Sequence, residues 1–217
     1  MKIKTDLHNH LGTDKYNGDF NSVINISSRQ LGQAGILGLC NGDDDRYESF
    51  IKSKGYDRED FKSFIYLPSK NIFIVKGQEV FTKQGHVLVL GLEKDKHINS
   101  KDLKDALKEA NDINEDSIKF PVHTFFFQGC GNYLIKNPKL IKYFDAIDVH
   151  SSEAIYGNKK AKQFYELIKN DSEIGAVSSS DGHSLYEIGS SQTILDLDLS
   201  SEFEPNKFIA SLRNSIK

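Results

Sequence analysis

The sequence predicts an α/β fold, in which short buried strands alternate with amphipathic helices. Apolar runs of strand length recur along the chain, among them residues 72–75 and 146–149. The segment that begins at Ser100 instead repeats apolar residues at the i, i+3, i+4 and i+7 positions of a helix that buries one face, starting at Leu103. Strands that alternate with helices in this way favour a parallel sheet or barrel.

The sequence of the first part of the chain predicts a strand, a helix and a second strand. Residues 3–7 are expected to form a strand, and Asp19 is suited to cap a helix over residues 20–33 that ends before Gly35. Residues 36–40 form the next strand, and an acidic run follows at positions 43–45. Two short helical stretches are expected between positions 47 and 67.

The second part continues the alternation as far as the C-terminus. Its expected strands and helices, in chain order, are the strands 72–75 and 87–92, the helix from Ser100, the strand 118–122, weak helices near 133–143, the strand 146–149, the helix 158–169, the strands 174–177 and 193–197, and a final helix that Pro205 opens.

Composition restricts the class of protein. The 217 residues suit one domain, and 38% hydrophobic with 27% charged residues is typical of a soluble chain. A net charge of −3 does not favour nonspecific binding to nucleic acid, although a local basic patch stays open. Cys40 and Cys130 lie far apart in the sequence and form no Cys-x-x-Cys pair, so a disulfide framework is not expected. We therefore expect the protein in the reducing cytoplasm. The start of the chain lacks a signal-peptide core, and no apolar run is long enough for a bilayer span, so no membrane association is expected.

Two pairs of polar residues follow predicted strands at the spacing of metal ligands. In the His8-Asn9-His10 segment, alternate side chains of a strand share a face, so both imidazoles point the same way. The Asp181-Gly182-His183 segment repeats this spacing with a carboxylate and an imidazole. An Asp-Gly turn is the alternative interpretation of Asp181, and it is compatible with a metal site.

Three further ionisable residues lie near strand ends. Glu79 is placed to bridge two divalent cations, and His86 follows it closely. The alternative for Glu79 is a solvated hairpin in which it pairs with Lys83, and the alternative for His123 is a buried, hydrogen-bonded histidine. Because the C-terminal ends of parallel strands meet at one rim, these side chains together indicate a metal centre there.

In combination, these segments resemble the PHP family, named for polymerase and histidinol phosphatase. The matching segments follow the family order along the whole chain and are Asp6-Leu7-His8-Asn9-His10, Gly35-Ile36-Leu37-Gly38-Leu39 leading to Asp43, Gly77-Gln78-Glu79 with Gly85-His86, Pro121-Val122-His123, and Ser180-Asp181-Gly182-His183 with Ile188-Gly189. The resemblance implies a distorted (β/α)7 TIM-like barrel, formed by residues 1–217 as one hydrolase domain. It also implies two or three divalent cations (Zn, Mn or Fe) and phosphoester hydrolysis.

The resemblance assigns roles to individual residues. It implies the metal ligands His8, His10, Glu79, His86, His123, Asp181 and His183, of which Glu79, Asp181 and His183 are also the expected catalytic residues. The sequence departs from the family pattern at two positions, and both concern the ligands of a third cation. Asp44 stands where the family has a histidine, and an oxygen donor there favours harder cations such as Mn²⁺ or Mg²⁺. For a ligand after the first histidine pair, Asp14 is the first candidate and Asp19 the second, with a helix N-cap as the alternative for Asp19.

Several other side chains lie near these segments. His150 is interpreted either as a neighbour of the site or as a plain strand-end histidine, and His97 as solvent-exposed and unrelated. Arg46 and Lys83 are candidates to meet a phosphate, with a solvated side chain as the alternative. The run of residues 125–127, three phenylalanines, is suited to a substrate wall, to core packing or to a partner surface.

The predicted function is metal-dependent hydrolysis of a phosphoester by activated water. A small phosphorylated molecule is the favoured substrate. A nuclease is the second possibility, which the acidic balance disfavours, and a metal-binding domain without turnover is the third, which the substitution at Asp44 keeps open.

Overall fold

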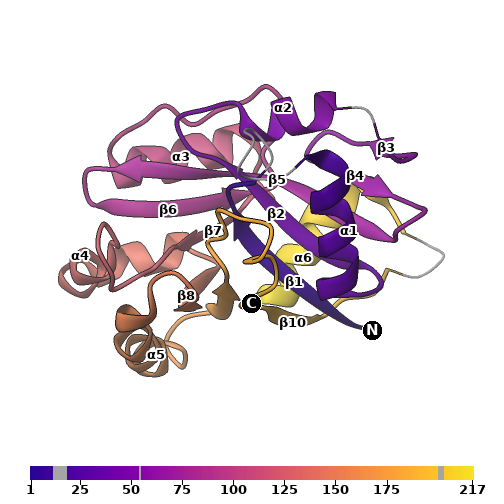
Figure 1. Ribbon diagram of the computed structural model, residues 1–217. Helices are drawn as coiled ribbons and strands as arrows, with labels where there is room; N and C mark the ends of the chain where they lie inside the picture. Colours follow the sequence, from indigo (N-terminus) through magenta and orange to yellow (C-terminus); the bar gives the residue numbers. More distant parts are fainter. Residues whose placement is uncertain (12–18, 54, 200–202) are drawn as a thin grey trace.

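The computed structural model describes residues 1–11, 19–53, 55–199 and 203–217 and shows a mixed α/β architecture (Figure 1). Its strands and helices, in chain order, are β1 (Lys2–Asn9), α1 (Phe20–Leu31), β2 (Gly35–Asn41), α2 (Arg46–Lys52), β3 (Glu59–Asp60), β4 (Phe64–Leu67), β5 (Ile72–Thr82), β6 (Gly85–Leu90), α3 (Leu103–Ile113), β7 (Ile118–Pro121), α4 (Gly131–Lys136), the 3₁₀ helix η1 (Pro138–Tyr143), β8 (Ala146–Ser151), α5 (Ile155–Ile168), β9 (Gly175–Ser179), β10 (Thr193–Asp196), the 3₁₀ helix η2 (Pro205–Lys207) and α6 (Phe208–Ile216).

The main sheet has both parallel and antiparallel strand pairs. Its strands follow the order β10-β1-β2-β5-β4-β3, and β5 also pairs with β6, which pairs with β7. The β1–β2 and β2–β5 pairs are parallel, whereas the β1–β10, β4–β5, β5–β6 and β6–β7 pairs are antiparallel. The sequence-based expectation of a parallel sheet is therefore only partly right. Two residues connect β5 to β6, which suffices for a hairpin but not for the crossover that a parallel pair requires.

A second, parallel pair of strands, β8 and β9, lies between β7 and β1. The amide of Asp145 donates to the carbonyl of Lys119 at 2.8 Å, and the amide of His10 donates to the carbonyl of Gly182 at 2.7 Å. These single hydrogen bonds bring the ends of β8 and β9 next to the main sheet. The C-terminal ends of β1, β7 and β9 consequently approach one another.

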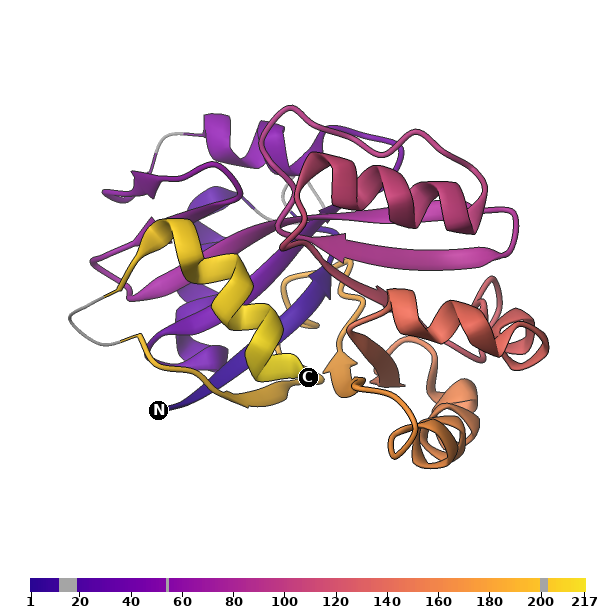
Figure 2. The same cartoon turned by 180° about the vertical axis from the view of Figure 1, so that it is seen from behind.

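The alternation of side chains along the central strands builds two apolar layers. Ile36 and Phe73 belong to a core cluster with Phe208 of α6, whereas their neighbours Leu37 and Ile74 pack in a cluster with α1. Accordingly α1 and α6 lie on opposite faces of the sheet, as the two views in Figures 1 and 2 show. A third cluster joins β6, α3 and α5. Burial on both faces explains why β2 is apolar without alternation.

Most predicted elements are present, with three corrections. The first helix ends at Leu31 because Gly32 adopts a φ of 74°, and Gly35 instead begins β2. Of the two helical stretches expected between positions 47 and 67, the described residues of this segment contain one, because residues 64–67, with the sequence FIYL, form a strand that pairs with β5. The strand expected over residues 72–75 extends to Thr82. Among the described residues, no helix is long and apolar enough to cross a bilayer.

Candidate metal centre

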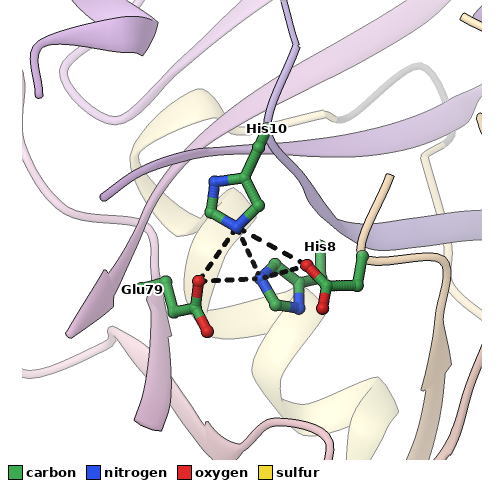
Figure 3. Close-up of side chains that lie close together, drawn as sticks. His8, His10 and Glu79 are labelled. Carbon is green, nitrogen blue, oxygen red and sulfur yellow. Dashed lines mark hydrogen bonds and ion pairs between the residues drawn. The ribbon is translucent and has the colours of Figure 1, made fainter. Parts of the chain in front are cut away.

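Four of the predicted ligands converge from three different strands. His8 lies near the end of β1 and His10 just beyond it, Glu79 lies within β5, and Asp181 follows β9. Figure 3 shows the imidazoles of His8 and His10 pointing toward the carboxylate of Glu79. The donor atoms of these four residues all lie within 4.8 Å of one another. Residues that are up to 173 positions apart in the sequence thus form one cluster of nitrogen and oxygen donors.

The distances within this first cluster fit ligands that share one cation. Nε2 of His8 lies 3.0 Å from Nε2 of His10, 3.7 Å from Oε2 of Glu79 and 3.4 Å from Oδ1 of Asp181. Nε2 of His10 lies 3.0 Å from Oε2 of Glu79 and 3.6 Å from Oδ1 of Asp181. Donors held about 2.0–2.2 Å from a tetrahedral ion are roughly 3.3–3.6 Å apart, so this donor set is suited to a divalent cation.

A second cluster contains the other oxygen of the Glu79 carboxylate. Oε1 of Glu79 lies 2.9 Å from Nδ1 of His86 and 3.1 Å from Nε2 of His123. These three residues form a separate group of donors that could hold a metal ion. Glu79 is therefore shared by two histidine pairs, which is the arrangement expected of a carboxylate that bridges two cations. The alternative pairing of Glu79 with Lys83 is not observed, because the buried carboxylate of Glu79 faces histidines whereas Lys83 is exposed.

Burial and mutual charge shift the pKa values of the first cluster. Burial raises the pKa of Glu79, but hydrogen bonds from His10 and His123 outweigh burial and hold that pKa well below its ordinary value. Burial lowers the pKa of His8, yet Asp181 and Glu79 outweigh it and raise the pKa to about 9. The pKa of His10 is lowered by burial and by the neighbouring His8. Glu79 is thus ionised, and its negative charge stabilises either protonated histidines or a cation beside it.

Main-chain groups and a buried acid orient the histidines. Nδ1 of His10 lies 3.2 Å from the carbonyl of Cys40, which can only accept a hydrogen bond, so Nδ1 carries a proton and Nε2 faces the cluster. The amide of His123, a residue with a φ of 33°, donates to Oδ2 of Asp148 at 3.0 Å. Burial raises the pKa of Asp148 to about 6. The sequence motifs do not identify Asp148, although an acidic residue inside an apolar strand is a signal for it.

A second buried acid holds the segment that carries Asp181. Oδ1 of Asp6 accepts the amide of Ser180 at 3.0 Å, and its Oδ2 accepts the hydroxyl of Ser180 at 2.7 Å and the amide of Gly189 at 2.8 Å. Asp181 adopts a φ of 58°, in line with the expected Asp-Gly turn. The turn and the position of Asp181 in the cluster coexist, as the sequence suggested.

Three other predicted ligands lie at the border of the site or outside the described residues. The exposed imidazole of His183 has its ring centroid 4.9 Å from that of His10, and its Nδ1 lies 2.8 Å from the carbonyl of Asp181. Asp44 is instead held by Arg46, whose Nη2 and Nε lie 2.8 and 3.1 Å from Oδ2. Asp14 falls outside the described residues.

The remaining candidates have other surroundings. Asp19 is the N-cap of α1, with its carboxylate accepting the amide of Ser22 at 3.0 Å. Nδ1 of His150 lies 3.1 Å from the hydroxyl of Ser191. Arg46 also donates to the carbonyl of His10, which places this guanidinium beside the first cluster.

His97 is less isolated than the sequence suggested. Its Nε2 lies 3.3 Å from Asp45, and with Glu48 these residues form a third group of possible ligands. Glu48 is already paired with the buried ammonium of Lys76, and Asp45 is mostly exposed. In this group a lysine neutralises the buried carboxylate, whereas the carboxylate of Glu79 faces histidines.

Comparison of the sequence with protein-family models and with curated proteins finds no match. Solved structures match the fold over nearly the whole chain. PsfC from Pseudomonas syringae PB-5123 is 16% identical with a TM-score of 0.62, and the match covers 97% of this chain and 88% of PsfC.

Two further structures have a similar fold. Endonuclease Q, in complex with a 27-mer duplex substrate with an abasic lesion at the active site, is 17% identical with a TM-score of 0.61. A two-domain protein from Bacteroides vulgatus ATCC 8482, which contains a predicted PHP-like metal-dependent phosphoesterase, is 15% identical with a TM-score of 0.58. The match covers 96% and 98% of this chain but only 56% and 64% of the two larger chains. The fold is therefore the one found in these proteins.

Proposed function

We propose that this chain is a metal-dependent phosphoester hydrolase of the PHP type. The observation that carries the proposal is the position of Glu79, whose two carboxylate oxygens each face a separate pair of histidines. Such a shared carboxylate, buried and ionised, is typical of centres with two cations. The fold shared with a predicted PHP-like phosphoesterase supports the same conclusion. We also propose that residues 1–217 form one domain, whose two sheets close into a distorted TIM-like barrel.

The residues of the chain have distinct roles in this proposal. His8, His10, Glu79 and Asp181 would hold one cation, and Glu79, His86 and His123 would hold the other. A divalent cation in such a site activates water as a nucleophile and offsets negative charge on phosphate oxygens. His183, exposed beside His10, is the group we assign to proton transfer to the leaving oxygen. Arg46, next to the first cluster, offers a positive charge to the phosphate.

A third cation is a separate part of the proposal. We assign Asp44 as its ligand, in place of the family's histidine, which requires Asp44 to exchange Arg46 for the cation. Asp14 is the second ligand that the resemblance implies. Because Asp44 supplies an oxygen donor, this position would prefer Mn²⁺ or Mg²⁺ over Zn²⁺.

Metal analysis combined with a hydrolysis assay tests the proposal. Protein stripped with a chelator and reconstituted separately with Zn²⁺, Mn²⁺ and Fe²⁺ is analysed for bound metal and assayed on p-nitrophenyl phosphate and on bis-p-nitrophenyl phosphate. We expect at least two equivalents of metal and turnover of one of these esters. His8→Ala and Asp181→Ala should lose both metal and turnover, whereas the control His97→Ala should keep both. A protein that retains no metal after reconstitution contradicts the proposal.

A further inference from the structure

A buried ion pair lies under α2, where the contact between a helix and a sheet is ordinarily apolar. Nζ of Lys76 on β5 contacts Oε1 of Glu48 on α2, and the two residues are 0% and 5% exposed. Ile74 and Val80 alternate onto the same face of β5, and both belong to apolar clusters. An apolar pair would stabilise this contact equally well, because burial of two charges carries a large desolvation penalty. The ion pair therefore calls for a reason other than stability.

Both members of the pair form further hydrogen bonds. Nζ of Lys76 also donates to the carbonyls of Glu93 and Lys96 at 3.1 and 2.8 Å, so each of its three N–H donors has an acceptor. Oε2 of Glu48 accepts Nδ2 of Asn41 at 2.8 Å. Burial raises the pKa of Glu48, but the hydrogen bonds from Lys76 and Asn41 outweigh burial and hold that pKa below its ordinary value. The ionised pair thus joins β2, α2, β5 and the segment after β6.

The same network fixes the first turn of α2. Asp45 precedes the helix without a side-chain hydrogen bond to it, and Oδ1 of Asn41 instead accepts the amide of Tyr47 at 2.6 Å. The next residue, Glu48, is held by Lys76. Two consecutive residues of the first turn are therefore tied to β2 and β5 through buried side chains, which restrict both the position and the tilt of the turn.

Arg46 is the residue directly before these two. Its Nη1 donates to the carbonyl of His10, and its Nε and Nη2 lie 3.1 and 2.8 Å from Oδ2 of Asp44. A long side chain loses rotamer freedom when it is held in one place, so a preorganised backbone lowers the cost of that contact. The position of the first turn of α2 consequently decides whether the guanidinium reaches the first cluster.

We propose that Glu48 and Lys76 are positioning residues, which fix the start of α2 so that Arg46 meets a phosphate beside the first cluster. The role of Arg46 toward the phosphate rests on the proposed function. The dependence of its position on the buried pair does not, because neither Glu48 nor Lys76 is a candidate ligand in the Glu79 clusters.

Replacement of both charges tests the position of Arg46. In the double variant Glu48→Gln/Lys76→Met, the glutamine keeps an acceptor for Asn41, and neither charge is left buried without its partner. A crystal structure of this variant should show the guanidinium of Arg46 displaced from the carbonyl of His10. Arg46 in its wild-type position would overturn the inference, whatever the metal content.

Calorimetric titration of the metal-loaded protein with inorganic phosphate measures the consequence. We expect Arg46→Ala to weaken phosphate binding about 10-fold, through the loss of a charge-assisted hydrogen bond. The double variant should show a similar loss. Arg46→Ala added to it should have less than about a 2-fold further effect, because the guanidinium is already out of place. With p-nitrophenyl phosphate, both variants should raise KM more than they lower kcat. Additive losses would contradict the positioning role.

A second buried lysine provides the matched control. Lys119→Met removes it, while its neighbour Asp145 keeps Arg213 at 2.7 Å and Lys217 at 3.2 Å. This variant should bind phosphate like the wild type. If the double variant does not fold, Asn41→Ala loosens the first turn of α2 with both charges in place and should give the same loss of phosphate binding.

The outcomes separate this inference from the proposed function. Wild-type affinity for phosphate in the folded double variant, or in Asn41→Ala, would overturn the inference. A protein that binds no metal contradicts the proposed function alone, since the crystal structure of the double variant still tests whether the buried pair positions Arg46.

Discussion

The buried carboxylate of Asp148 accepts the backbone N–H of His123 at 3.0 Å, while the imidazole of His123 reaches Glu79 on its other side. His123 adopts a φ of 33°, a conformation that is unfavourable for a residue with a Cβ. The amide of His150 also donates to Oδ1 of Asp148 at 3.3 Å. Asp148 therefore stabilises a strained backbone that directs a candidate ligand into the second cluster.

Removal of this acceptor should weaken metal binding. We expect Asp148→Ala to lower the affinity for zinc by about 10–100-fold, because the position of His123 is no longer fixed. Competition with a chromophoric chelator measures the affinity. Asp148→Asn keeps a carbonyl acceptor and should stay close to the wild type, which separates the hydrogen bond from simple loss of packing. Wild-type affinity in the alanine variant would show that Asp148 does not position His123.

The shared position of Glu79 predicts unequal losses of metal among variants. Glu79→Gln removes the negative charge from both clusters, so its metal content should fall by more than one equivalent. His86→Ala affects only the second cluster and should lose about one equivalent while the first stays occupied. Elemental analysis after gel filtration gives these contents. Equal losses in the two variants would show that Glu79 does not join two sites.

The stability of the metal-free protein should depend on pH through His8. The pKa of His8 is about 9 in the folded protein against 6.5 ordinarily, because Asp181 and Glu79 outweigh burial. A raised pKa gives stability that is complete below pH 6.5 and is lost as the pH rises through 9. Burial lowers the pKa of Lys119 to about 8, which acts in the opposite direction only above that pH.

Between pH 6.5 and 8, the pKa shift of His8 affects the stability and that of Lys119 does not yet do so. We expect the free energy of unfolding of the chelated wild type, from urea titrations, to fall as the pH rises across this window. His8→Gln should show a smaller decline or none. A stability that rises with pH in the wild type would contradict the assigned ion pairs. Zinc affinity should rise over the same window, since the cation competes with the proton on His8.

The departure at Asp44 gives a prediction about the third cation. Asp44→Ala should lose about one equivalent of Mn²⁺, and Asp44→His should raise the occupancy by Zn²⁺, because a nitrogen donor suits the softer ion. Arg46→Ala removes the competing partner of Asp44 and should lose no metal. An unchanged content of Mn²⁺ in Asp44→Ala would mean that Asp44 serves only to hold Arg46.

The sequence by itself determined most of the helices and strands. It also determined that the donors of the candidate site are imidazole nitrogens and carboxylate oxygens. Periodicity of the apolar residues identified α3 and α5, and the apolar runs identified β2, β8 and β9, because each side-chain pattern reflects a local backbone geometry. The spacing of His8 and His10 placed both imidazoles on one face for the same reason. The motifs also predicted that Glu79 is placed to bridge two cations, and its two oxygens face separate pairs of histidines.

Only the tertiary structure decided which partners these residues meet. The β5–β6 hairpin is antiparallel because of its two-residue connection, and it brings His86 opposite Phe81, close to Glu79. Arg46 meets the carbonyl of His10, and Asp148 meets the backbone of His123, through contacts that no local pattern encodes. Contacts between residues far apart in the chain depend on how strands and helices pack, and a linear pattern does not contain that information.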